Sequence, residues 1–193
     1  MARGYEEVLQ AMNTNRVTLQ QRVAEIRADK RYTSEAKRAM VTAAYTEAMA
    51  QHNSLRSELA AAREVTLATA RGRAFASRDA STAGQAAYRE ALAQARAASS
   101  DGRQLAALFD QASQTRDYTL LRALALVGHQ TDNLALTESV ARHDRDVADL
   151  LEVEARLGDR QSLDMRLANS VAATAPARPA EVSQTVVNAA MMR

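Results

Sequence analysis

Three histidines are the side chains of this sequence best suited to acid–base or metal chemistry: His52, His129 and His143. Only His143 has carboxylates beside it, in the run HDRD of residues 143–146, with Asp149 one helical turn further on. Such a cluster could hold a hard metal ion or supply a general base. A working site also needs groups that converge from a second element, and the sequence shows none. We therefore interpret the run as a charged helix face turned to solvent.

The other two histidines have simpler interpretations. No His or Cys lies three or four residues from His52, so a ligand pair on one helix face is missing, and we expect His52 on an interior helix seam. His129 follows Gly128, which we take as a helix end, so a solvated turn is expected there. The chain has no Cys and no phosphate-loop, HExxH or GxSxG motif. We predict no catalytic residue, cofactor or metal site, and hence a protein that is not an enzyme.

Positive charge is concentrated in residues 27–38, which we call the basic tip. Its cations are Arg27, Lys30, Arg31, Lys37 and Arg38. A patch of this kind can bind phosphates in a salt-dependent manner. Asp29 and Glu35 dilute the charge, and Tyr32 is the one aromatic side chain nearby that could stack on a base. We favour a solvated or protein-binding tip, with weak DNA binding as the alternative.

The elements that must position these residues begin with a predicted helical hairpin, residues 1–80. Tyr5, Met12, Leu19 and Ile26 recur every seventh residue, as in a coiled-coil seam. The positions expected between them are Leu9, Arg16, Val23 and Lys30. Thr33 or Ser34 can cap a second helix that folds back antiparallel on the first. The seam predicted for the second helix is Val41, Tyr45, Ala48, His52, Leu55, Leu59, Ala62 and Thr66.

Beyond the hairpin we predict a helical connector or hinge, residues 81–103, and a compact helical bundle, residues 104–170. Gly128 and Gly158 are expected helix ends, and Asp132 an expected start. A short helix from Arg160 adds Leu163 and Leu167 to the predicted core. Nowhere do apolar and polar residues alternate as in a strand, so the fold class is all-α.

Residues 171–193 are predicted to be an extended C-terminal arm. Pro176 and Pro179 disfavour a regular helix, and a segment that buries little has no fixed shape by itself. The partner-binding residues proposed for the arm are Pro176, Pro179, Val186, Val187, Met191 and Met192. We expect a different polypeptide, a sister subunit or another protein, to order the arm.

Composition bounds the remaining possibilities. The formal net charge is +2, too small for a dedicated DNA-binding protein, and aromatic residues make up 4%. No apolar run is long enough to span a membrane, and the first residues do not resemble a secretory signal. We expect no membrane contact, cytoplasmic synthesis, and a homo-oligomer, because an alanine-rich core gains little from burial within one chain.

The segment RADKRYTSEAKRAMVTAAYTEA, residues 27–48, resembles helical proteins encoded among the head and connector genes of tailed actinobacteriophages. The resemblance covers residues 1–75 and carries over no functional residue. It implies a virion structural component at the head or the head-tail junction, made in the host cytoplasm and bound to copies of itself or to capsid or portal subunits. Two alternatives stay open: a capsid scaffolding protein, and a coiled-coil regulator with a weak DNA-binding tip.

Overall fold

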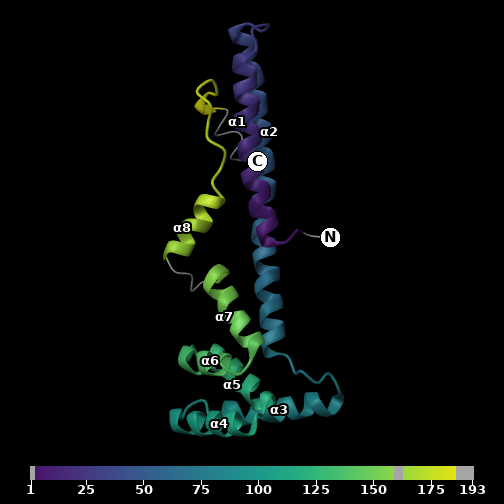
Figure 1. The fold of residues 1–193 in the computed structure, drawn as a ribbon, viewed down its shortest axis with the longest axis vertical. Helices are drawn as coiled ribbons and strands as arrows, with labels where there is room; N and C mark the ends of the chain where they lie inside the picture. Colours follow the sequence, from purple (N-terminus) through teal and green to yellow (C-terminus); the bar gives the residue numbers. More distant parts are fainter. Residues whose placement is uncertain (1–2, 159–162, 186–193) are drawn as a thin grey trace. The chain divides into compact units, whose positions relative to one another are not determined.

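A computed structural model describes residues 3–158 and 163–185 (Figure 1). Over these residues the chain forms eight helices and no strand, which confirms the all-α prediction. The helices are α1 (Tyr5–Ala28), α2 (Ser34–Phe75), α3 (Thr82–Ala97), α4 (Gly102–Thr115), α5 (Tyr118–Gln130), α6 (Leu134–Ala141), α7 (Arg145–Leu157) and α8 (Leu163–Ala172). No helix of this described part is long and apolar enough to cross a membrane.

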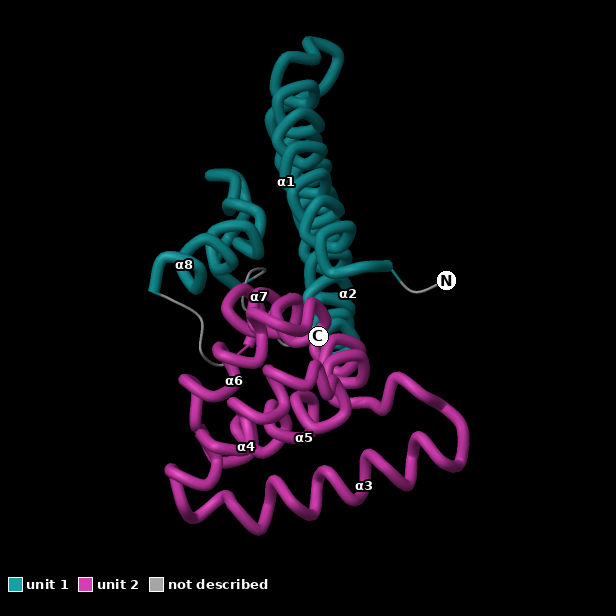
Figure 2. Tube along the Cα trace, turned by 60° about the horizontal axis from the view of Figure 1, so that its bottom comes forward, with its two compact units in different colours: residues 1–66, 162–193 teal, residues 67–161 magenta. Residues whose placement is uncertain are grey.

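The chain divides into two compact units, coloured separately in Figure 2. Unit 1 combines residues 1–66 with 162–193, and unit 2 is the stretch between them, 67–161. These boundaries differ from the predicted ones at 80, 103 and 170. Residues 81–103, expected as a hinge, contain α3, which contributes Ala91 and Ala95 to the core of unit 2. The small side chains of α3 give a weak apolar pattern in the sequence, yet they allow close packing on α5.

In unit 1, α1 and α2 pack along each other. The side-chain amide of Asn15 donates to the carbonyl of Ala48 at 2.9 Å, and Nζ of Lys37 donates to the carbonyl of Arg27 at 2.8 Å. Rising numbers on α1 thus meet falling numbers on α2, so the two helices run in opposite directions. The helix restart is capped as predicted, because Oγ1 of Thr33 accepts from the backbone N–H of Ala36 at 3.2 Å.

The seam of α1 differs from the predicted one at the intermediate positions. Val8 and Asn15 are buried, whereas Leu9 and Arg16 are half-buried and Lys30 is exposed in the turn. The heptad positions and Val23 were predicted correctly, but Val8 and Asn15 take the places predicted for Leu9 and Arg16. Asn15 is tolerated in this interior because its amide has the Ala48 carbonyl as acceptor.

The core of unit 2 is built around α5, which packs against α3, α4 and α6 and is buried along most of its length. The predicted helix end at Gly128 is wrong, because α5 continues to Gln130. A Cβ added at Gly128 would lie 2.9 Å from Oγ1 of Thr137, so the residue serves the close approach of α6. The expected start at Asp132 is also wrong: Asn133 caps α6 by accepting from the N–H of Leu136.

Candidate functional site

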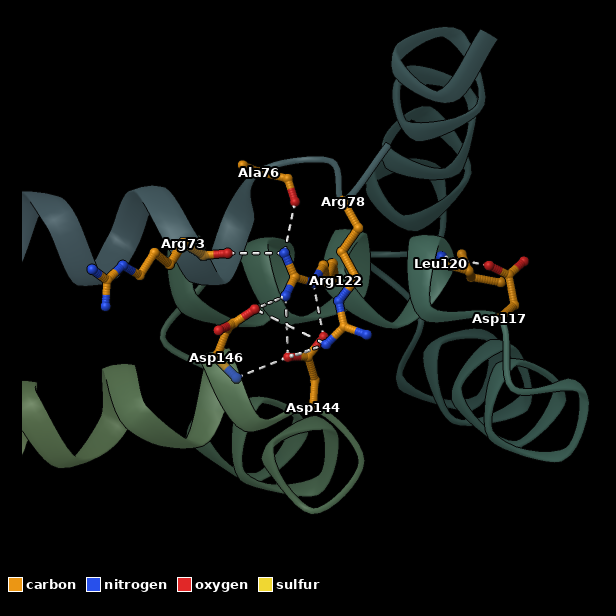
Figure 3. Close-up of polar contacts among 8 residues, drawn as sticks. All are labelled: Arg73, Ala76, Arg78, Asp117, Leu120, Arg122, Asp144 and Asp146. Carbon is orange, nitrogen blue, oxygen red and sulfur yellow. Dashed lines mark hydrogen bonds and ion pairs between the residues drawn. The ribbon is translucent and has the colours of Figure 1, made fainter. Parts of the chain in front are cut away.

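The run HDRD was interpreted from sequence as a solvated face, which holds for the exposed His143 and Arg145. Its two carboxylates, Asp144 and Asp146, instead belong to an ion-pair cluster in unit 2 (Figure 3). Asp144 is 1% exposed and caps α7 by accepting from the N–H of Asp146 at 2.9 Å. Arg122 of α5, 3% exposed, donates through Nε to Asp144 at 2.8 Å and also binds Asp146. The sequence interpretation failed because the partner of Asp144 lies 22 residues away on another helix.

The same guanidinium holds the end of α2. Nη1 of Arg122 donates to the carbonyls of Arg73 and Ala76, both at 2.9 Å, which satisfies backbone acceptors that a helix end leaves unpaired (Figure 3). Burial by itself lowers the pKa of Arg122, but hydrogen bonds and attraction from Asp144 and Asp146 raise it overall. Burial likewise raises the pKa of Asp144, and the bond from Arg122 brings it below its usual range. One charged side chain thus ties α2, α5 and α7 together.

A second buried carboxylate, Glu154 of α7, joins the same three helices. Its Oε1 accepts from Arg71 at 3.0 Å and contacts Nε2 of His129 at 2.9 Å. His129 also packs on the ring of Phe75, with 5.2 Å between ring centroids. The solvated turn expected at His129 is therefore wrong. Burial raises the pKa of Glu154, but the hydrogen bonds from His129 and Arg71 lower it overall.

In both clusters the charged side chains are paired with one another inside unit 2. Each buried carboxylate has a guanidinium partner within hydrogen-bond distance, so neither is available to a ligand in this arrangement. In residues 3–158 and 163–185, no three His, Cys, Asp or Glu side chains are grouped so that they could hold a metal ion. The role that these contacts support is structural: they hold α2, α5 and α7 together.

Of the predicted arm, residues 171–172 belong to helix α8 instead, and residues 173–185 lie in a groove of the hairpin within unit 1. We call residues 173–185 the arm and this surface the arm groove. Val182 is 2% exposed, and Pro176 is buried while Pro179 is half-buried. The apolar residues packed with Val182 come from both hairpin helices: Leu19, Val23, Ile26, Val41, Ala44, Tyr45, Ala48 and Met49. At the near end of the arm, Ala173 packs on Val8, Met12 and Leu55.

One ion pair fastens the arm to α1. The two nitrogens Nε and Nη2 of Arg27 donate to the two carboxylate oxygens of Glu181 at 2.7 and 2.8 Å. The hydrogen bonds from Arg27 lower the pKa of Glu181 to about 2. Nη1 of Arg178 donates to the side-chain oxygen of Gln184 at 2.9 Å, a contact inside the arm. The two parallel hydrogen bonds between Arg27 and Glu181 fix the direction of the arm as well as its position.

The expectation that only another polypeptide could order the arm is wrong for residues 173–185, because their own chain does so. Two helices by themselves leave apolar side chains at the edge of their seam, and the arm covers part of that edge. Val186, Val187, Met191 and Met192, also proposed as anchors, lie outside the described residues. Sequence periodicity identified the seam but could not show which segment covers it.

The basic tip carries less available charge than its composition suggests. Arg27 is paired with Glu181, Arg31 with Asp29 at 2.6 Å, and Lys37 with the carbonyl of Arg27. Side-chain and backbone hydrogen bonds involving Arg31 lower the pKa of Asp29 to about 2. The side chains of Arg27, Lys30, Arg31 and Arg38 are exposed, and that of Lys37 is half-buried. Three of the five predicted phosphate contacts therefore have acceptors within the chain.

Helix α8 presents a surface that the sequence analysis placed in a core. Leu163, Leu167 and Val171 are 71%, 56% and 64% exposed. Their spacing of four residues puts them on one face of the helix, and we call them the α8 stripe. Met165 and Asn169 are half-buried, and α8 contacts α1 within unit 1. The prediction that Leu163 and Leu167 belong to the bundle core is wrong.

Searches with this chain against protein-family models, curated proteins and solved structures give no match.

Proposed function

We propose that this protein is a non-enzymatic structural component of a tailed-phage particle, at the head or the head-tail junction, and that it works through helical contacts with neighbouring subunits. The single observation that supports the contact mechanism is the α8 stripe. The particle and its location come from the resemblance of residues 27–48 to phage head and connector proteins. The protein partners are copies of this chain or other particle subunits.

The orientation of α8 is the physical argument. Burying a Leu or Val side chain contributes roughly 1.5–3 kcal/mol relative to leaving it in water. The α8 stripe does not obtain this free energy of burial within its own chain, since Leu163, Leu167 and Val171 are each more than half exposed. A helix that served only its own unit would gain by turning this stripe inward. Contiguous apolar side chains left at a surface mark sites of protein contact, so we assign the stripe to a subunit interface.

The same observations weigh on the alternatives. A DNA-binding regulator needs free cations at the basic tip, and Arg27, Arg31 and Lys37 are already bound by the chain. A scaffolding protein would use the same stripe but leave before the particle matures. Mass spectrometry of purified mature particles separates the two cases: the structural role requires stoichiometric amounts of the chain, and its absence from mature particles would refute that role.

Sedimentation velocity of the purified chain tests the contact. We expect a mass that rises with concentration in the parent protein and stays at the monomer value in Leu167→Lys. The control is Val65→Lys, because Val65 is 66% exposed on α2 but belongs to no stripe. Leu167 is itself mostly exposed, so the variant should fold, which circular dichroism checks. Equal self-association of the parent and Leu167→Lys would remove the α8 stripe from the proposal.

A further inference from the structure

We infer that the arm groove also accepts the arm of a second copy, so that two chains exchange residues 173–185 reciprocally. The inference rests on the proposed function, since exchange is one way in which neighbouring subunits are joined. The partner is a second copy of this chain, and the contact joins the hairpin groove that includes Arg27 to the arm that carries Glu181 and Val182.

The arm takes its shape from the groove more than from itself. Residues 175–183 contain no helix, and within them the backbone N–H of Val182 donates to the carbonyl of Pro179 at 3.1 Å. The contacts that place the arm are instead the burial of Val182 and the fork between Glu181 and Arg27. A segment held in this way is a separable ligand for its groove.

The arm that occupies the groove can come from the same chain or from a second copy, and the contacts in the groove are the same in both cases. The two parts of unit 1 are separated in the chain by the whole of unit 2, residues 67–161. A second copy presents an identical arm to an identical groove, so each contact made within one chain can be made between two. Only the entropy of association and the path of the connecting segment distinguish the two states, which is why exchange of identical elements is a low-cost route to dimers.

The seated arm does not fill the whole of the arm groove. A cavity of about 320 Å³ lies against it, lined by residues of α1 that include Leu19 and Val23 and by arm residues that include Arg178 and Pro179. The Arg27 and Glu181 side chains are 52% and 27% exposed, so water and salt screen their attraction. Such a contact can open without unfolding the hairpin. The freed groove then exposes the apolar seam edge that the second arm covers.

Charge reversal provides a direct test. In Arg27→Glu the groove repels its own Glu181, and in Glu181→Arg the arm is repelled by its own Arg27. Each variant alone faces like charges both within the chain and in a dimer with itself. A reciprocal dimer of one variant with the other restores an opposite-charge pair at both grooves. The chain that carries both substitutions restores the pair internally and is the matched control for folding.

We would mix equal amounts of the two single variants at low ionic strength and measure the dimers by native mass spectrometry. We expect the ratio of mixed to like dimers to exceed the binomial ratio by roughly tenfold, because two repulsive pairs become two attractive ones. We also expect the excess to vanish at high salt. Binomial proportions would overturn the inference while leaving association through the α8 stripe intact. A mixture that stays monomeric would likewise overturn the inference.

To keep the two failures apart, the same mixture is prepared with Leu167→Lys in both chains. Survival of the mixed-dimer excess in this background would show exchange that does not need the α8 stripe, in support of the inference and against the stripe as the required contact. Loss of all dimers with the stripe removed, together with binomial proportions when the stripe is present, would leave the proposed function standing and reject arm exchange.

Discussion

At the scale of single residues, Arg122 connects three helices of unit 2. It neutralises Asp144 and satisfies the two carbonyls at the end of α2, and both charged side chains are almost fully buried. A buried charge that loses its partner is far more costly than a buried pair is beneficial. Removing one member of the cluster is therefore expected to lower the stability of unit 2, even if an apolar replacement of the whole cluster would not.

We expect Arg122→Met to lower the free energy of unfolding by about 3–5 kcal/mol, because the buried Asp144 keeps only the half-exposed Arg78, 3.3 Å away, as counter-charge and two backbone carbonyls lose their donor. Urea unfolding followed by circular dichroism measures the loss. Arg89→Met, at an exposed position of α3, is the control and should change stability by no more than about 0.5 kcal/mol. Similar stabilities for the two variants would contradict the role given to Arg122.

His52 makes a pH-dependent contribution within the hairpin. It is 5% exposed, and its Nδ1 has no hydrogen-bond partner among the described residues. Burial first, and then the charge of Arg56, lowers its pKa below 6.5. Because the folded state holds the neutral ring, the unfolded chain binds the proton more readily once the pH falls below 6.5. Stability is thus full above that pH and declines as the pH falls toward the lowered folded pKa.

The test is the urea midpoint between pH 7.5 and 5 for three proteins. The parent should lose stability on acidification, and His52→Leu should lose less of it, since no proton is taken up at that position. His143→Gln, which changes an exposed histidine, should retain the parent's pH dependence. If His52→Leu follows the parent curve throughout, the buried neutral state of His52 is wrong.

At the scale of elements, two glycines show how helices are matched to their surroundings. Gly72 lies in α2, with nothing within 4 Å of an added Cβ. Gly128 lies in α5, where the same atom would also meet the carbonyl oxygen of Asn133 at 3.2 Å. Both positions are helical, and neither glycine has a positive φ. Their difference is one of packing alone.

We expect Gly72→Ala to raise the free energy of unfolding by about 0.5–1 kcal/mol, the usual gain from alanine in a helix interior. Gly128→Ala should instead destabilise by about 1–3 kcal/mol, because α6 must move away from α5. Thermal unfolding of the two variants side by side gives the signs. A stabilised Gly128→Ala would show that α5 and α6 pack less closely than described.

The elements also show how far sequence reasoning reaches. The seam positions Tyr5, Met12 and Leu19, the cap at Thr33 and the end of α7 at Gly158 were predictable, because each depends on local spacing or chemistry. The pairing of Arg122 with Asp144 and the seating of Val182 were not, because they join residues far apart in the chain. The break between α6 and α7, where Asp144 caps α7, was not predicted.

Burial was predicted where apolar spacing recurs, and α8 shows the limit of that inference. The interval between Leu163, Leu167 and Val171 indicates one apolar face, but spacing does not say what covers it. The structure leaves this face uncovered in unit 1, so the pattern does not belong to the core for which it was predicted.

At the scale of the whole molecule, the described residues form separate hydrophobic clusters in the two units, and α2 contributes to both units. The cluster around α5 includes Ala74, Leu124 and Leu150, while the hairpin cluster includes Leu19 and Val41. Because the Arg122 network belongs to the first set, we expect Arg122→Met to accelerate amide hydrogen exchange in α5 and α7 and to leave α1 unchanged within error. Equal acceleration in α1 would mean that the two units unfold as one.

The most direct measurement of the central claim is amide hydrogen exchange of residues 163–172 as a function of protein concentration. If the α8 stripe is a subunit contact, protection of these amides should rise in step with the oligomer fraction measured by sedimentation, and Leu167→Lys should abolish the rise. Oligomers that form while the exchange of residues 163–172 stays at its monomer rate would contradict the account.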